Sequence, residues 1–113
     1  MKTLKFRIYD KDKKGFHYLN SIWNMPDPCY DGEVQQWTGL LDSHGKEIWE
    51  GNIIKFEKNN YQVLFNNGCF VATRQNKSPY SYKELWNICF VSEVIGDIYS
   101  NPELLNSQNQ NDK

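Results

Sequence analysis

The sequence predicts a mainly β fold, in which antiparallel strands form curled sheets of a small SH3-like barrel type with a short C-terminal helix. Two observations carry this expectation. Segments of about five or six residues, rich in β-branched and aromatic side chains, recur along the chain and are separated by clusters of Asn, Asp and Gly. In the first of these segments, Leu4, Phe6 and Ile8 alternate with polar or cationic residues, and a period of two is typical of a strand with one buried face.

The first half of the chain is expected to form two hairpins separated by a loop. In order, the expected elements are a strand over residues 4–9, a charged turn over 11–15, a returning strand over 16–19, a proline-containing loop over 24–32, a strand over 34–40, a turn over 42–45 and a strand over 47–49. The turn over 42–45 starts with Asp42 and ends with Gly45. Asp accepts hydrogen bonds from the backbone that follows it and Gly tolerates a positive φ, so this order favours a β-turn.

The second half is expected to form a meander and then a less regular C-terminal part. The expected strands and turns of the meander cover 52–57, 58–60, 61–65, 66–68 and 69–74. A helical turn over 81–86 fits a capping box between Ser81 and Glu84. The apolar run over 88–95 suits a strand buried on both faces, and Pro102 suits the first position of a short helix over 101–105.

Length and composition indicate one small domain over residues 1–105, followed by a wholly polar and disordered tail over 106–113. With a formal net charge of −1, the chain has no basic footprint for nucleic acid or for an anionic membrane surface. The N-terminus has no signal-peptide pattern, and no apolar run is long enough to span a membrane. A reduced, cytoplasmic protein with free thiols is therefore expected.

Three segments together resemble the YopX family of small proteins from bacteriophages and prophages. They read K-F-R-I-Y-D over 5–10, T-G-L-L-D-S-H-G-K-E-I-W-E-G-N-I-I over 38–54, and E-V-I-G-D-I-Y-S-N-P-E-L-L over 93–105. Their order and spacing match the family pattern, with two departures: Asn52 where the family favours Asp, and Asp97 where it favours Asn. The resemblance implies a phage or prophage origin in a bacterial host cell, and it implies no established biochemical activity.

The residues that could support metal binding or catalysis lack the necessary spacing. The candidate metal ligands His17, His44, Cys29, Cys69 and Cys89 form no local pair of the kind that a structural zinc site needs, so neither a metal nor a cofactor is expected.

The best candidates for acid–base chemistry are carboxylates: Glu47 and Glu50 flank a turn, and Asp97 follows a Gly at the end of an apolar run. Acidic residues are rarely buried without a partner, so solvated turn residues are the favoured interpretation, and the chain is not expected to be an enzyme.

Binding is the more plausible class of function, and two candidate surfaces differ in their partner. Lys5, Arg7 and Tyr9 share one face of the first expected strand, and this mixture of cations and an aromatic ring can stack on single-stranded nucleic acid. Trp23 can instead anchor a second copy of the chain or a host or phage protein. Because the overall charge is close to neutral, a protein-binding or self-associating module is favoured over the nucleic-acid alternative.

Overall fold

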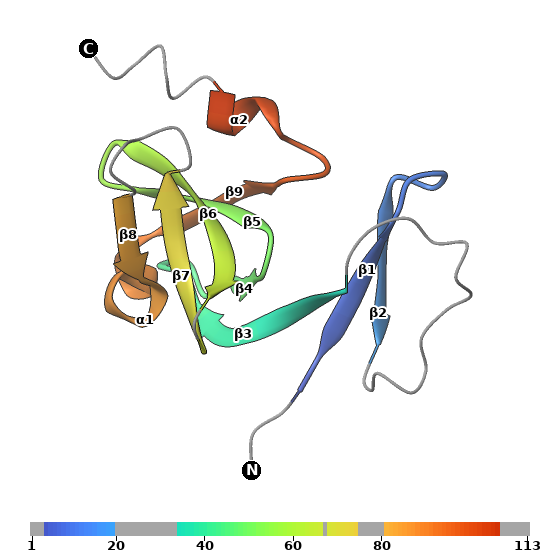
Figure 1. Cartoon of the computed structure of the whole chain (residues 1–113), viewed down its shortest axis with the longest axis horizontal. Helices are drawn as coiled ribbons and strands as arrows, with labels where there is room; N and C mark the ends of the chain where they lie inside the picture. Colours follow the sequence, from blue (N-terminus) through green and yellow to red (C-terminus); the bar gives the residue numbers. More distant parts are fainter. Residues whose placement is uncertain (1–3, 20–33, 67, 75–80, 107–113) are drawn as a thin grey trace.

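The computed structural model describes residues 4–19, 34–66, 68–74 and 81–106. These residues form two antiparallel sheets and short helices (Figure 1). The elements are β1 (Phe6–Asp10), β2 (Gly15–Leu19), β3 (Gln35–Leu41), β4 (Glu47–Trp49), β5 (Asn52–Phe56), β6 (Asn59–Asn66), β7 (Cys69–Arg74), β8 (Ser81–Glu84), α1 (Leu85–Ile88), the 3-10 turn η2 (Cys89–Val91), β9 (Glu93–Asp97) and α2 (Glu103–Asn106). The predicted mainly β fold is confirmed: the sheets curl into a half-barrel, and a short helix lies near the C-terminus.

The first sheet has the strand order β2-β1-β3-β4. The β1–β2 hairpin projects from the rest of the molecule, and β3 runs from this hairpin to the half-barrel (Figure 1). At the tip of the hairpin, the Asp10 side chain accepts hydrogen bonds from the backbone N–H groups of Asp12 (3.0 Å) and Lys13 (3.3 Å), which favours the turn.

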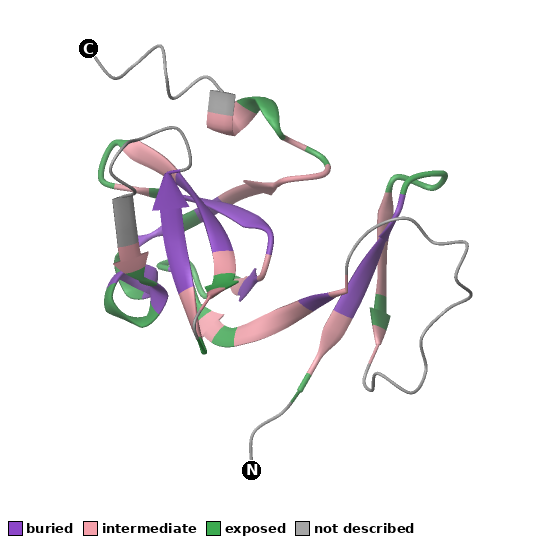
Figure 2. Ribbon diagram, in the orientation of Figure 1, coloured by how far each residue is buried: buried purple, intermediate pink, exposed green. Residues whose placement is uncertain are grey.

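The second sheet has the strand order β8-β7-β6-β5-β9, and it supplies most of the hydrophobic core. Within this sheet the buried residues lie mainly on β5, β6 and β7, and β1 of the first sheet is buried as well (Figure 2). The core cluster also takes residues from β4, α1, η2 and β9, and it comprises Ile48, Ile54, Tyr61, Val63, Ala72, Leu85, Ile88, Cys89 and Val94. Burial of this apolar area is the main favourable contribution to folding.

The expected turn at residues 42–45 is confirmed. Gly45 has a φ of +78°, and its N–H donates to the carbonyl oxygen of Asp42 (3.0 Å). The Asp42 Oδ1 atom accepts hydrogen bonds from the N–H groups of His44 and Lys46, both at 2.8 Å. Its Oδ2 atom accepts one from Val94 (2.9 Å) on β9, so this turn also joins the two sheets.

The prediction of a doubly buried strand over 88–95 is wrong. Residues up to Val91 form α1 and η2, and the strand covers only Glu93–Asp97. Ile88 and Cys89 point into the core, whereas Phe90 and Val91 are exposed, so the run has a helical arrangement of buried and exposed residues.

The helical turn expected over 81–86 is also displaced along the chain. Residues Ser81–Glu84 form β8, which pairs with β7, and α1 starts at Leu85. Glu84 is the N-cap residue of α1, and it makes no side-chain capping hydrogen bond. Pairing with a neighbouring strand has here outweighed the local capping signal.

The first strand differs from its prediction in burial. Leu4 is exposed and lies before the strand, while residues 7–10 are all buried, so both faces of β1 are covered. No helix in the described part of the chain has the length and apolar character needed to cross a membrane.

Candidate functional site

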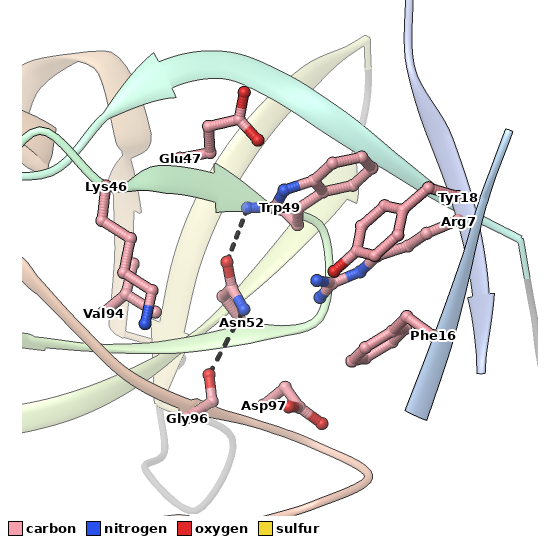
Figure 3. A pocket seen from close by; sticks show the side chains of 10 residues that line it. All are labelled: Arg7, Phe16, Tyr18, Lys46, Glu47, Trp49, Asn52, Val94, Gly96 and Asp97. Carbon is pink, nitrogen blue, oxygen red and sulfur yellow. Dashed lines mark hydrogen bonds between the residues drawn. The ribbon is translucent and has the colours of Figure 1, made fainter. Parts of the chain in front are cut away.

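The side chain of Arg7 lies at the centre of a pocket between the two sheets (Figure 3). Only 4% of Arg7 is exposed. Its guanidinium carbon lies 3.8 Å from the centre of the Phe16 ring and 4.9 Å from that of Trp49, distances at which cation–π attraction is favourable. The Nε–H group donates a hydrogen bond to Oε1 of Gln35 (2.8 Å), whereas Nη2 is shielded from water and has no hydrogen-bond acceptor.

The electrostatic environment of Arg7 keeps a positive charge in a place where burial is costly. Burial lowers the pKa of the Arg7 guanidinium, while the hydroxyl of Tyr18 and the carboxylate of Asp97 act in the opposite direction. A guanidinium remains protonated even when its pKa falls moderately. The pocket therefore contains a buried cation whose hydrogen-bonding capacity is only partly used.

The pocket has a volume of about 370 Å³. Aromatic side chains form one part of its wall and charged or amide side chains form the other (Figure 3). The lining consists of Arg7, Phe16, Tyr18, Lys46, Glu47, Trp49, Asn52, Val94, Gly96 and Asp97, and we refer to it as the Arg7 pocket. Its size and mixed lining are typical of sites that hold a small organic group.

Asn52 and Asp97 occupy directly paired positions on β5 and β9 at the floor of the Arg7 pocket. The Asn52 side chain accepts a hydrogen bond from the N–H of Trp49 (2.6 Å) and donates one to the carbonyl of Gly96 (3.3 Å). Oδ1 of Asp97 accepts hydrogen bonds from the backbone N–H groups of Tyr99 and Ser100, two and three residues further along the chain. Both side chains are thereby held in fixed orientations.

The expected solvated face of Lys5, Arg7 and Tyr9 does not exist in the structure. Arg7 and Tyr9 are buried, and the Tyr9 ring stacks on Tyr99 with a centroid separation of 4.6 Å. Lys5 is half-buried, and its ammonium group lies 4.1 Å from the centre of the Trp37 ring. Aromatic side chains from other strands cover this face: the Phe16 ring lies against both Tyr9 and Arg7, and the Trp49 ring lies against Arg7.

Glu47 and Glu50, two of the predicted acid candidates, have different partners in the structure. Glu47 lines the Arg7 pocket and forms an ion pair with Lys5. Glu50 accepts a hydrogen bond from the N–H of Gln36 (3.1 Å) and so joins the end of β4 to β3. Both are half-buried, which differs from the expected fully solvated turn. Trp23, the expected anchor, lies outside the described residues.

The structure thus brings together Arg7, Glu47 and Asp97 from the predicted candidates, and it adds residues that the sequence did not identify. Of these added residues, Phe16 and Tyr18 come from the returning strand of the first hairpin, and Trp49 comes from β4. The sequence could have indicated the residues of the returning strand, because a hairpin over these residues pairs Tyr18 directly with Arg7. Nothing in the sequence pattern places β4 and β9 against this hairpin.

A second concave surface lies between β3, the β6–β7 hairpin and α1. Its volume is about 620 Å³, and its described lining has no charged side chain. The lining consists of Gln36, Trp37, Thr38, Gly39, Leu40, Phe65, Gly68, Cys69, Phe70 and Trp86, and we refer to it as the apolar groove. Phe65 and Trp86 are 52% and 61% exposed, although both have large apolar side chains.

Within the described ranges, no group of three or more His, Cys, Asp and Glu side chains is arranged to hold a metal ion. Cys89 is buried in the core and Cys69 is half-buried at the start of β7, and both are free thiols. His17 lies 3.2 Å from the carboxylate of Asp10.

A mainly β protein with a pocket between two curled sheets is the class that these features define. The model of the YopX protein family matches residues 6–106, almost the whole chain, and the chain therefore belongs to the YopX family. Among solved structures, the crystal structure of protein EF1440 from Enterococcus faecalis is similar, with 24% sequence identity, coverage of 90% of this chain and 97% of that chain, and a TM-score of 0.61. At this identity the likeness shows the fold alone. A comparison with curated proteins gave no match.

Proposed function

We propose that this YopX-family chain is a non-enzymatic protein-binding module whose partner inserts an apolar segment into the apolar groove. The observation that carries the proposal is the lining of this groove, which is rich in aromatic residues and has no described charged side chain. An exposed concave surface of this kind is typical of protein-binding sites, because aromatic side chains supply most of the binding energy at interfaces.

The chemistry of the groove determines the kind of partner. The described part of the lining has no charged side chain to compensate a charged group, so desolvation disfavours an ionic ligand there. The groove lies between several elements and presents Phe65 and Trp86 at its rim, which suits one or two large aliphatic or aromatic side chains of a partner protein. A second copy of the chain is the other occupant that the experiment below distinguishes.

Fewer observations support the nucleic-acid alternative than support protein binding. Its proposed stacking surface depended on Arg7 and Tyr9, and both are buried. This alternative would be favoured if labelled single-stranded DNA sedimented together with the protein and if the bound fraction decreased as the salt concentration rose. The phage or prophage origin and the cytoplasmic location remain expectations from the sequence.

The proposal can be tested by selecting peptides from a random display library on the immobilised protein. We expect the selected peptides to contain aromatic or aliphatic anchors and to lose affinity about 30-fold against Trp86→Ala, the effect of a typical hot-spot residue. Leu4→Ala is the matched control, because Leu4 is a similarly exposed apolar residue outside the groove. Peptides that bind Trp86→Ala and the unchanged protein equally well would contradict the proposal.

Sedimentation velocity on the same proteins distinguishes the occupants. A monomer that binds the selected peptides supports a heterologous partner. A concentration-dependent dimer that Trp86→Ala converts to a monomer would assign the groove to a second copy of the chain.

A further inference from the structure

We infer that the Arg7 pocket is a binding site for a carboxylate on a small apolar body, separate from the apolar groove. The central observation is the guanidinium of Arg7, which is buried and has an Nη2 group without a hydrogen-bond acceptor. Leaving a charged donor buried and unsatisfied is costly, so a site of this kind is expected to be completed by an acceptor. The planar guanidinium fork matches a carboxylate or a phosphate with two parallel hydrogen bonds, and the charges around the pocket decide between them.

The orientation of Arg7 is fixed by its neighbours. Gln35 holds the Nε–H group at 2.8 Å, and the rings of Phe16 and Trp49 lie against the guanidinium. These contacts leave the terminal Nη end directed into the space between Trp49, Asn52 and Asp97 (Figure 3). A guanidinium that is already oriented loses little conformational entropy when it binds an anion.

The balance of charge around the pocket favours a single negative charge on the ligand. Two cations, Arg7 and Lys46, and two carboxylates, Glu47 and Asp97, line the pocket, and Glu47 is already paired with Lys5. A dianion such as phosphate is attracted twice as strongly by the two cations and repelled twice as strongly by Asp97, but the cost of removing it from water rises more steeply than its charge. The pocket therefore selects a monocarboxylate over a phosphate.

The walls of the pocket indicate what the carboxylate is attached to. Phe16, Tyr18 and Trp49 supply three aromatic rings, and the Tyr18 and Trp49 rings are in edge-to-face contact at 5.3 Å. Rings of this kind pack well against a flat or aliphatic group. A volume of about 370 Å³ accommodates such a group together with its carboxylate.

Access to Nη2 involves Tyr18. This residue is 61% exposed, and its hydroxyl interacts with the guanidinium. Because so much of its surface is already in water, a shift of the Tyr18 hydroxyl end, with the ring still beside Trp49, costs little buried area and opens the way to the terminal nitrogens. The incoming carboxylate then supplies the acceptor that Nη2 lacks.

The test is a titration of ¹⁵N-labelled protein with sodium benzoate, monitored by NMR at the Arg7 Nε–H and the Trp49 indole N–H. Benzamide is the control ligand, since it has the same ring and nearly the same shape without the charge. We expect saturable shifts at both signals with benzoate and none with benzamide. Equal shifts with the two compounds, or no saturable shift with benzoate, would overturn the proposal.

Three variants locate the binding to the pocket. Arg7→Lys keeps the charge and removes the planar fork, so we expect benzoate to bind at least tenfold more weakly, the loss of roughly one charge-assisted hydrogen bond. Lys46→Met changes an exposed residue of the lining, and a severalfold loss is expected even if Arg7→Lys fails to fold. Lys55→Met removes an equal charge from an exposed position outside the pocket and is the matched control. A similar loss for Lys55→Met and Lys46→Met would contradict the site.

Two further ligands identify the source of the carboxylate. N-acetyl-Ala-Phe with a free C-terminus represents a peptide terminus, and its C-terminal amide is the control. Tighter binding of the free peptide than of benzoate supports a peptide C-terminus, whereas binding of benzoate alone supports a free metabolite-sized acid. Displacement of benzoate by inorganic phosphate at lower concentration than by acetate would overturn the assignment to a monocarboxylate.

Discussion

Replacement of Asp42 tests the joint between the two sheets most directly. Asp42 is buried, with 6% of its surface exposed, and its two carboxylate oxygens accept three backbone hydrogen bonds. Two come from His44 and Lys46 in its own turn, and the third comes from Val94 on β9. In Asp42→Ala all three donors lose their acceptor, whereas in Asp42→Asn the amide oxygen can still serve one side of this set.

The expected cost follows from the location of each donor. The N–H of Val94 is at a buried position, and an unsatisfied buried donor costs about 1–3 kcal/mol. The donors of His44 and Lys46 belong to exposed residues and can bind water, so each contributes about 0.5–1.5 kcal/mol. Together these effects predict a loss of about 3 kcal/mol for Asp42→Ala. For Asp42→Asn we expect about 2 kcal/mol, because the amide N–H₂ faces the N–H of Val94 without an acceptor between them.

The measurement is urea unfolding with thermal unfolding as a second readout. For a domain of this size, a loss of about 3 kcal/mol lowers Tm by about 12 °C or more. Asp12→Ala, which removes an exposed carboxylate in the first hairpin, is the control and should change the stability by about 0.5 kcal/mol or less. A change below about 1 kcal/mol for Asp42→Ala would refute the reasoning that this carboxylate joins the sheets.

Three further outcomes are expected. Burial would raise the pKa of Asp42, but the hydrogen bonds to its carboxylate outweigh burial, so the pKa is lowered in the folded protein. The ionised carboxylate therefore contributes its full stabilisation above the unfolded pKa of about 4, and this stabilisation is lost as pH falls through the lower folded pKa. Urea unfolding at a series of pH values should show this loss, and the loss should be smaller in Asp42→Ala. Gly45→Val should cost about 1–2 kcal/mol in thermal unfolding because φ at this position is +78°, while Gly15→Ala should be nearly neutral, and an unchanged Tm for Gly45→Val would contradict the assigned turn. Asn52→Asp should lower the stability by about 1–3 kcal/mol, since a carboxylate cannot donate to the Gly96 carbonyl. The double variant Asn52→Asp with Asp97→Asn should lose less than the sum of the two single variants, and a loss equal to that sum would exclude coupling between the two positions.

The parts of the fold that the sequence predicted correctly are those that local chemistry determines. The Asp42–Gly45 turn depends on the carboxylate of Asp42 and the positive φ of Gly45, and both act within a few residues. The run at 88–95 was interpreted incorrectly because a continuous apolar run fits a buried strand and a buried helical turn equally well. Only tertiary contacts place Ile88 and Cys89 in the core while Phe90 is left exposed.

The candidate site depended far more on contacts between distant segments. The alternation of Lys5, Arg7 and Tyr9 with apolar residues predicted a first strand with one face exposed to solvent, as in an isolated hairpin. The sequence does not indicate that Trp49, more than 40 positions after Arg7, covers that face. The buried arginine, which is the most informative residue of the site, was therefore assigned to the surface.

The two departures from the YopX pattern acquire a common explanation in the structure. Position 52, where the family favours Asp, and position 97, where it favours Asn, are directly paired across β5 and β9, and both line the Arg7 pocket. This chain has the amide at 52 and the carboxylate at 97, so the exchange preserves one carboxylate and one amide beside the buried guanidinium. A buried cation requires a negative charge nearby, and in this chain Asp97 on β9 meets the requirement. The absence of Asp at position 52 therefore does not remove the charge balance of the pocket, because Asp97 supplies it from the neighbouring strand.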